Sequence, residues 1–399
     1  MKGGKSKIIT GIAGFLIVAS ALWAVALALA IKPVGGLELD TNAQSSEPAG
    51  EEITFVWPSE GAAAIGMNDK IKSDFNGDEV RAMASITKVV TALVVLDKKP
   101  INTGEIGEVL TMTDKDVALY QKTKAAGGSN IEVKAGEEIN QVDMLKAMML
   151  VSANNIADSL ANWAFGSEEE YVAAANDWLA QKGFTDTKAA DASGLDPASV
   201  STANELVKLA MLADRSTVLQ SVFSTKDARF QGAQIINTNT LLGINGIYGL
   251  KTGHTSAAGA NLLFVSKYKL GQNEGAIYGV VLGQTDENLF QAAKDLNDSA
   301  QSNIGKVVVL AKGSVVGQVT SRWGDKSDIV VANDLMTVNW KDENDALVAV
   351  NAGTDLGGMT SVAGGQKVGE ATVGFESVDV VTKYTLRAPS FLWRITNPF

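Results

Sequence analysis

The chain of 399 residues contains no cysteine, which excludes disulfides, thiolate nucleophiles, iron–sulfur clusters and zinc sites with cysteine ligands. It contains one histidine, His254, so no metal site can draw on two histidine ligands. A Ser-His-Asp triad would have to use that single residue as its base. These absences remove most thiol and metal chemistry from consideration.

Basic residues are scarce relative to acids: 34 Lys and Arg stand against 45 Asp and Glu, for a net charge of −11 at pH 7. Such a chain is a poor partner for nucleic acid, because nucleic-acid binding relies on neutralising phosphates. The acids are unevenly spread, since residues 1–32 hold four lysines and no acid. A basic tip before an acidic body indicates two different environments.

One long apolar run, Ile8–Ile31, carries no charged residue. About 20 apolar residues span a bilayer as a helix, so the run predicts an N-terminal transmembrane helix. Lys2, Lys5 and Lys7 precede it, which predicts a cytoplasmic N-terminus and an exported body, bound to the cell membrane by a single pass. A cleaved signal peptide ending near residues 28–30 is the alternative, but signal h-regions are shorter than this run.

The remaining chain has 46% hydrophobic residues overall and enough length for two or three domains. Residues 1–32 form the cytoplasmic tip and anchor, and the polar, acidic residues 33–52 are predicted to form a flexible linker. Residues 53–304 mix helix and strand patterns and are predicted to form the catalytic domain. Residues 305–399 show short apolar runs separated by Gly, Asp and Asn, typical of a small all-β domain.

Within the mixed region, hydrophobic periodicity predicts a sheet covered by a helical cluster, an α/β (α+β) arrangement. The helices are predicted from Ile86 to Leu96 and over 141–163, 168–181 and 289–304, and the strands over 260–269 and 275–282. The apolar tail, residues 388–399, is predicted to be a last core strand of the β domain rather than a foot on the membrane.

The first motif with chemical meaning is Ser85-Ile86-Thr87-Lys88, at the start of an apolar helix. Residues three apart lie on one helix face, so the hydroxyl and the amine can touch. A lysine of lowered pKa can then take the proton of the serine. On its own, a capping serine beside a solvated lysine is the more common explanation of this pattern.

Two further motifs follow in the chain. Ser152-Ala153-Asn154 places polar groups in an apolar stretch. In a functional interpretation, Ser152 relays a proton and the Asn154 amide forms hydrogen bonds in the site; on its own, the motif is more simply a turn. Lys251-Thr252-Gly253, followed by His254, offers a charge and a hydroxyl suited to a carboxylate, with a glycine that lets a ligand approach the backbone. Alone, it is an ordinary strand end.

The ordered trio is far rarer than its parts, and with it the chain resembles the D-alanyl-D-alanine carboxypeptidases, low-molecular-mass penicillin-binding proteins of the serine peptidase type. The resemblance covers about residues 55–300. It rests on Ala84–Lys88, Ser152–Ala157, Ala192–Asp196 and Gly249–Thr255. It implies a catalytic domain of the penicilloyl-serine transferase, or β-lactamase-like, fold. An N-terminal anchor departs from the family's usual C-terminal membrane segment.

The resemblance also implies a substrate, the peptidoglycan stem peptide ending in D-Ala-D-Ala, and β-lactam antibiotics as covalent inhibitors. Lys251 and Thr252 would hold the terminal carboxylate, beside Gly253 and His254, and Asn154 would hold Lys88 or the substrate. No metal and no cofactor is expected.

The implied reaction begins when neutral Lys88 takes the proton of Ser85, which attacks the penultimate carbonyl. The backbone N–H groups of Ser85 and His254 would form the oxyanion hole. Ser152 would pass a proton to the leaving D-alanine, and water would hydrolyse the acyl-enzyme.

Three alternatives stay open. A β-lactamase shares the trio but needs fast deacylation, and the acidic run at residues 168–170 reads as the first turn of a helix rather than as its extra glutamate. A peptidoglycan DD-endopeptidase would use the same residues. A non-enzymatic wall-binding module with a relic site is the third.

Overall fold

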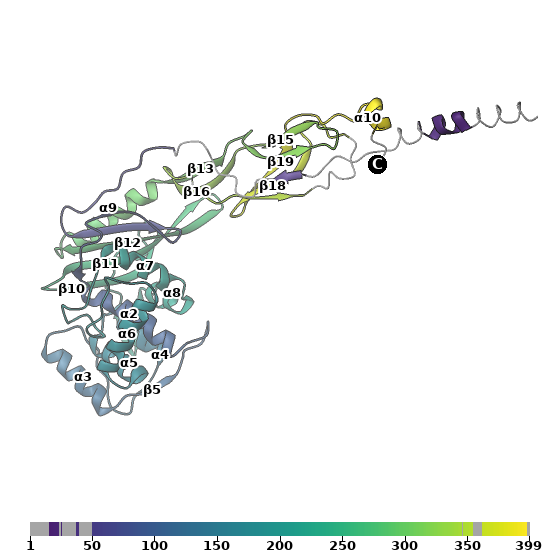
Figure 1. Cartoon of the computed structure of the whole chain (residues 1–399). Helices are drawn as coiled ribbons and strands as arrows, with labels where there is room; N and C mark the ends of the chain where they lie inside the picture. The colour runs from purple at the N-terminus through teal and green to yellow at the C-terminus, as the bar shows by residue number, and fades with distance from the viewer. Residues whose placement is uncertain are drawn as a thin grey trace, which may run out of the picture. The chain divides into compact units, whose positions relative to one another are not determined.

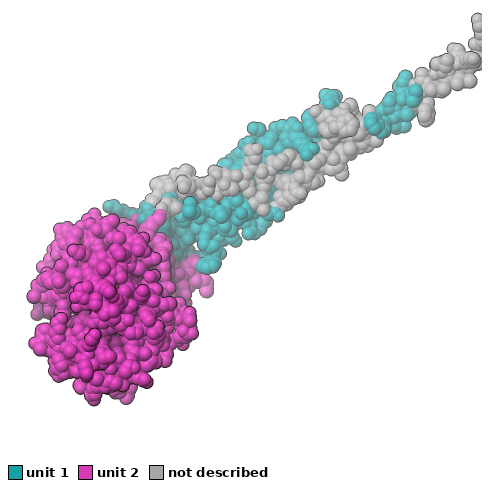
Figure 2. All heavy atoms as spheres, turned by 60° about the horizontal axis from the view of Figure 1, so that its bottom comes forward, with its two compact units in different colours: residues 1–53, 304–399 teal, residues 54–303 magenta. Residues whose placement is uncertain are grey.

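The computed structural model describes residues 16–23, 25, 37–39, 50–344, 346–353 and 361–396. The chain divides into two compact units (Figure 2): unit 2 is Thr54–Asn303, and unit 1 combines Met1–Ile53 with Ile304–Phe399. The division thus falls within a residue of the predicted boundaries, and unit 1 also takes up the N-terminal residues.

The membrane helix predicted over Ile8–Ile31 lies mostly outside the described residues. Of this run, residues 16–23 and 25 are described and are helical. None of the helices in the described ranges combines the length and the apolar character that crossing a bilayer requires.

The main sheet of unit 2 is antiparallel, with strand order β10-β11-β12-β2-β3. Its strands are β2 (Ala62–Met67), β3 (Lys70–Phe75), β10 (Ile247–Thr255), β11 (Gly259–Leu270) and β12 (Asn273–Gln284). Side chains alternate between its two faces. Leu263 and Val265 join the core beneath the helical cluster, while Leu262 and Phe264 are buried on the face that α9 covers (Figure 1). The strands predicted over 260–269 and 275–282 are confirmed, within longer ones.

The helices of unit 2 gather mainly on one face of this sheet (Figure 1). They are η1 (Ala84–Ile86, a 3-10 turn), α2 (Thr87–Lys98), α3 (Asp114–Ala125), α4 (Gln141–Leu150), α5 (Asn154–Phe165), α6 (Glu168–Gln181), α7 (Ala203–Asp214), α8 (Thr217–Phe223) and α9 (Leu289–Ser302). Helix α2 contacts α4, α5, α6 and α7, so it forms the centre of the cluster.

The helical pattern over 141–163 is interrupted. Helix α4 ends at Leu150 and α5 begins at Asn154, with Ser152 between them in a left-handed conformation at φ +62°. The turn that this motif allowed is therefore present. The helix over 168–181 is confirmed, with Glu168, Glu169 and Glu170 in its first turn. Acids there suit the positive end of the helix dipole.

Short strand pairs complete unit 2 and shape the loops around the cluster. They are β4 (Arg81–Ala82) with β7 (Val200–Ser201), β5 (Val109–Thr111) with β6 (Glu138–Asn140), and β8 (Asp227–Phe230) with β9 (Ala233–Ile236). All three pairs are antiparallel.

The described part of unit 1 is mainly β structure, as predicted for the C-terminal region. Its larger sheet has the order β1-β14-β15-β19-β18-β17, and β13 pairs with β16. The bounds are β1 (Leu37–Leu39), β13 (Ile304–Leu310), β14 (Val315–Thr320), β15 (Lys326–Val331), β16 (Leu335–Trp340), β17 (Ala349–Ala352), β18 (Lys367–Val373) and β19 (Glu376–Thr382).

Two predictions about unit 1 need correction. The flexible linker predicted over 33–52 contains strand β1, which pairs antiparallel with β14. Its Leu-Glu-Leu sequence alternates apolar and polar residues, as a strand does. The last core strand predicted in the tail is instead helix α10 (Phe391–Thr396), where Trp393 packs against Trp323 with ring centroids 6.0 Å apart. A short apolar run fits either a strand or a helix, and periodicity alone does not separate them.

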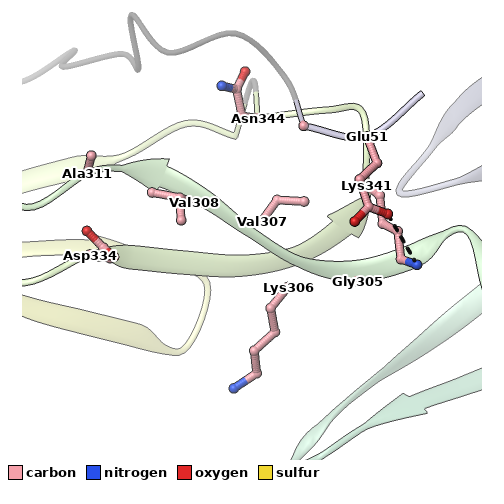
Figure 3. Close-up of a pocket in the computed structure, with 10 residues that line it drawn as sticks. Glu51, Gly305, Lys306, Val307, Val308, Ala311, Asp334, Lys341 and Asn344 are labelled. Atoms are coloured by element: carbon pink, nitrogen blue, oxygen red, sulfur yellow. Dashed lines mark ion pairs between the residues drawn. The ribbon is translucent and has the colours of Figure 1, made fainter. Parts of the chain in front are cut away.

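A hollow of about 550 Å³ lies beside β13 in unit 1 (Figure 3). Its lining combines the apolar side chains of Val307, Val308 and Ala311 with charged side chains, among them Lys306 and Asp334. At one end Lys341 and Glu51 form an ion pair of 3.7 Å. None of the residues singled out in the sequence lines it, so the candidate site must be sought in unit 2.

Candidate active site

Ser85 lies in η1, directly before α2, and is partly exposed. The segment leading to it is fixed from both sides: the Met83 N–H donates to the Ser199 carbonyl at 2.9 Å, and the Asn261 amide donates to the Met83 carbonyl at 3.3 Å. Ala84 is held at φ +49°, and its carbonyl accepts from the Thr87 hydroxyl at 2.8 Å. The Ser85 hydroxyl is thus carried by a well-anchored turn.

Lys88 lies one turn further along α2, fully buried, and its Nζ has three oxygen neighbours. These are Ser85 Oγ at 2.9 Å, Asn154 Oδ1 at 2.6 Å and the Ser193 carbonyl at 2.6 Å. The carbonyl and amide oxygens only accept hydrogen bonds. A neutral amine has two N–H groups, so these two acceptors use both and leave the nitrogen lone pair directed at the Ser85 hydroxyl.

Burial also favours the neutral amine. Desolvation lowers the pKa of Lys88 to about 7, against the opposing effect of the charges of Asp158 and Asp191. The neutral amine is therefore accessible near neutral pH. The capping-serine interpretation of Ser85 and Lys88 does not describe this geometry, because Lys88 is buried rather than solvated.

Asp158 was not singled out in the sequence. It lies four residues after Asn154 in α5, so both side chains occupy one helix face. Its burial and the nearby Glu168 raise the pKa of Asp158 to about 7, and its Oδ1 has no hydrogen-bond partner within the described residues. The spacing from Asn154 was the signal that could have identified it.

The Ser193 carbonyl is positioned by a carboxylate that sequence reasoning also missed, Asp191. Its two oxygens, which are mostly buried, accept from five donors, at 2.8–3.2 Å. These donors are the hydroxyls of Ser193 and Ser199 and the backbone N–H groups of Gly194, Leu195 and Asp196. One side chain thereby fixes the whole loop that presents an acceptor to Lys88.

Ser152 occupies the turn between α4 and α5 and is 7% exposed. Within the described chain its hydroxyl makes no hydrogen bond to Ser85 or Lys88. The neighbouring Asn154 makes the contact to Lys88 instead, and its backbone N–H donates to the Ser129 carbonyl at 2.8 Å. The Ser152 hydroxyl is therefore available to a ligand.

Lys251 and Gly253 lie two apart in β10, on one side of the strand. A Cβ on Gly253 would lie 3.0 Å from both the Ser85 nitrogen and the Met83 carbonyl oxygen. Gly253 therefore lets η1, rather than only a ligand, approach the backbone of β10 closely, and the two elements lie side by side. Lys251 is 1% exposed, and its Nζ donates to the Thr252 carbonyl at 2.9 Å.

The Lys88 and Lys251 amines interact electrostatically. Burial, and then the charge of Lys88, hold the pKa of Lys251 well below its usual range. Ser85 of η1, Lys88 of α2 and Lys251 of β10 therefore lie in one region.

Thr252 is half-buried, and its hydroxyl lies 2.6 Å from the hydroxyl of Thr238. The side chain of His254 is 57% exposed, with Nδ1 3.4 Å from Asp286 Oδ1. Lys88, rather than this imidazole, makes the hydrogen bond to the Ser85 hydroxyl.

Gly194 gives a test of how tightly the Asp191 loop fits the turn before Ser85. Gly194 has φ +80°, and an added Cβ would overlap the Ala84 carbonyl. Gly183 has φ +82° but no heavy atom of the described chain within 4 Å of such a Cβ. We expect Gly183→Ala to cost about 1–2 kcal/mol from backbone strain alone and Gly194→Ala about 1–3 kcal/mol more from the clash. Urea unfolding followed by tryptophan fluorescence measures both; equal losses would contradict the described contact.

The chain is similar to known proteins in both sequence and structure. The family model of peptidase S11, D-alanyl-D-alanine carboxypeptidase, matches residues 65–286, more than half of the chain. D-alanyl-D-alanine carboxypeptidase DacD of Salmonella typhimurium is 28% identical over 267 residues, 65% of this chain and 66% of the relative. D-alanyl-D-alanine endopeptidase of Pseudomonas aeruginosa is 34% identical over 200 residues, 48% of this chain and 61% of the relative. The chain thus matches just under two thirds of the length of these curated relatives.

Among solved structures, penicillin binding protein 5 from Haemophilus influenzae is similar, with a TM-score of 0.58 and 21% sequence identity over 84% of this chain and 99% of that one. At this identity the likeness concerns the fold alone. It confirms a penicillin-binding-protein fold of mixed helix and sheet. The resemblance noted in the sequence is also confirmed: the chain belongs to the D-alanyl-D-alanine carboxypeptidase family of peptidases.

Proposed function

We propose that this protein is a serine-type D-alanyl-D-alanine carboxypeptidase that removes the terminal D-alanine from peptidoglycan stem pentapeptides. The observation that carries the proposal is the contact of a buried, readily neutralised Lys88 amine with the Ser85 hydroxyl at 2.9 Å. A serine needs an adjacent base to act as a nucleophile, and this amine meets both the geometric and the pKa requirement.

Acylation begins with transfer of the Ser85 proton to Lys88. The Ser85 oxygen then attacks the carbonyl carbon of the penultimate D-alanine and forms a tetrahedral oxyanion. The backbone N–H groups of Ser85 and His254 stabilise that charge, a role inferred from the family resemblance. The approach of Gly253 to the Ser85 nitrogen supports it, because β10 then runs beside one of the two donors.

Collapse of the tetrahedral species breaks the peptide bond and expels the terminal D-alanine, whose nitrogen needs a proton. Ser152, which is mostly buried, takes the proton that Lys88 received from Ser85 and gives its own to that nitrogen, so Lys88 is neutral again. Water then attacks the ester on Ser85, with Lys88 again as the base, and releases the shortened peptide.

Lys251 and Thr252 bind the terminal carboxylate of the substrate. The Thr252 hydroxyl is half-buried at the edge of the site, and a carboxylate near Lys251 would compensate the positive charge that burial disfavours. β-Lactams carry a carboxylate and a reactive amide, and we propose that they acylate Ser85 in the same way.

Endopeptidase activity on cross-linked peptides is the second candidate, because one relative named D-alanyl-D-alanine endopeptidase is 34% identical to this chain. The same groups would cleave either bond. The two activities differ in the substrate that fits, rather than in the catalytic step.

We also propose that the apolar run Ile8–Ile31 holds the protein in the cell membrane by a single pass, with residues 53–399 outside and facing the wall. The uncharged run and the three lysines before it support this orientation.

Mass spectrometry of a stem pentapeptide incubated with the full chain tests the proposed activity. We expect loss of one alanine, and covalent labelling of the protein by a fluorescent penicillin. Ser85→Ala should reduce turnover by on the order of 10⁶-fold and abolish labelling, because the nucleophile is gone. Ser302→Ala, an exposed serine of α9, is the matched control and should behave like the wild type. Cleavage of dimeric muropeptides alone would favour the endopeptidase, and labelling of Ser85→Ala would exclude Ser85 as the nucleophile.

The pH dependence of acylation follows from the pKa of Lys88, which is about 7. Below that pH the amine holds a proton and has no lone pair for the Ser85 hydroxyl. The rate constant for penicillin acylation should therefore fall about tenfold per pH unit below about 7 and level off above it. Time-resolved labelling from pH 5 to 9 measures this profile.

The pH profile of the Asp158→Asn variant gives a second test of Lys88 as the titrating base. The charge of Asp158 raises the pKa of Lys88, but Asp158 is itself protonated below its own pKa of about 7, so the neutral amide should lower the midpoint of the profile only slightly. A wild-type rate that is constant across the range would rule out Lys88 as the titrating base.

Intact-mass measurement of the protein recovered from membranes tests the anchor. We expect a mass that includes residues 1–32 and resistance to carbonate extraction, because an apolar span of this length is not released by high pH. A mass lacking about the first 30 residues would instead support the signal peptide.

A further inference from the structure

The loop between β9 and β10 lies beside the proposed carboxylate site and was not singled out in the sequence. Two buried asparagines hold it, Asn237 and Asn239. The Asn237 amide donates to the Phe223 and Thr225 carbonyls, at 3.3 and 3.0 Å. The Asn239 amide donates to the Gly249 carbonyl of β10 at 3.2 Å. The loop is therefore fixed to the base of β10 through its side chains.

Thr238 stands between these asparagines, with its side chain exposed. Its backbone N–H donates to the carbonyl of Leu150, the last residue of α4, at 3.0 Å. Its hydroxyl lies 2.6 Å from the Thr252 hydroxyl. One residue thereby connects the helix end that leads to Ser152 with the strand that carries Lys251 and Thr252.

A bound carboxylate determines which of the Thr238 and Thr252 hydroxyls donates the hydrogen bond between them. Each hydroxyl holds a single proton, and either oxygen can be the donor in the unliganded pair. A carboxylate only accepts, so Thr252 must give its proton to a bound carboxylate. Thr238 then has to donate to the Thr252 oxygen. The Thr252 backbone is fixed as well, since its carbonyl accepts from Lys251.

We propose that Thr238 is a positioning residue, which directs the Thr252 proton toward the terminal carboxylate of the ligand. This inference rests on the proposed function. It makes Thr238 a determinant of selectivity for ligands with a free carboxylate, because a ligand without one leaves the hydroxyl pair free to point either way.

The experiment compares two probes on the full chain: benzylpenicillin, which carries the carboxylate, and its methyl ester, in which the carboxylate is masked. Thr238→Val keeps the shape of the side chain and removes the hydroxyl. We expect the acylation rate constant for benzylpenicillin to fall roughly three- to tenfold, the effect of losing one hydrogen bond, and that for the ester to stay within twofold.

Three further variants separate positioning from a general structural effect. Thr238→Ser keeps the hydroxyl and should recover most of the rate. Thr240→Val changes another exposed threonine of the same loop and should leave both rates unchanged. In a Thr252→Val background, Thr238→Val should have little further effect, because the hydroxyl that it directs is already absent.

The outcomes are distinguishable. Unchanged rates, or equal losses with both probes, overturn the role of Thr238 and leave the proposed function standing. Failure of the wild-type protein to react with either probe overturns the proposed function, and this inference with it.

Discussion

Burial of the Lys88 amine is the constraint on which unit 2 depends. An ammonium group removed from water loses its hydration, and the pKa of Lys88 falls to about 7 in consequence. The N–H groups of the buried amine keep hydrogen-bond partners because Asn154 Oδ1 and the Ser193 carbonyl accept from them. These acceptors lie 66 and 105 residues away in the chain. The helical cluster and the loop after Asp191 must therefore be correctly packed before the base exists at all.

Two strained backbone positions lie in the turns that lead to this group's partners. Ala84 and Ser152 are non-glycine residues in the left-handed region, at φ +49° and +62°. Such conformations cost of order 1–3 kcal/mol each and persist only where the surroundings impose them. The Thr87 hydroxyl holds the Ala84 carbonyl, and the Asn154 N–H bonded to Ser129 secures the chain just after Ser152. One strained turn leads to Ser85, whose hydroxyl contacts the Lys88 amine, and the other leads to Asn154, whose amide oxygen contacts it.

The sequence predicted the parts of this site that are carried by side chains at fixed spacing. The three-residue interval of Ser85 and Lys88 implied their contact, and β11, β12 and α6 followed from hydrophobic periodicity. The Ser193 carbonyl could not be predicted, because a main-chain acceptor leaves no trace in residue type. Thr238 was missed for a related reason: its contact to Thr252 depends on a loop whose course is set by tertiary hydrogen bonds. Sequence pattern alone also gave the wrong structure for β1 and α10. In both, a short apolar run adopted the structure that allowed it to contact its neighbours, β14 for β1 and Trp323 for α10.

Two buried amines in one site impose a condition on the charge that each can carry. The charge of Lys88 lowers the pKa of Lys251, so a proton on one disfavours a proton on the other. Asp158 and Asp191 favour the charged form of Lys88 and oppose its burial. A carboxylate bound near Lys251 shifts this balance, because it stabilises a proton on Lys251 and offsets the effect of burial there. Under the proposed function, the carboxylate of the substrate thus supports the charged form of Lys251, and a ligand without the carboxylate reacts more slowly.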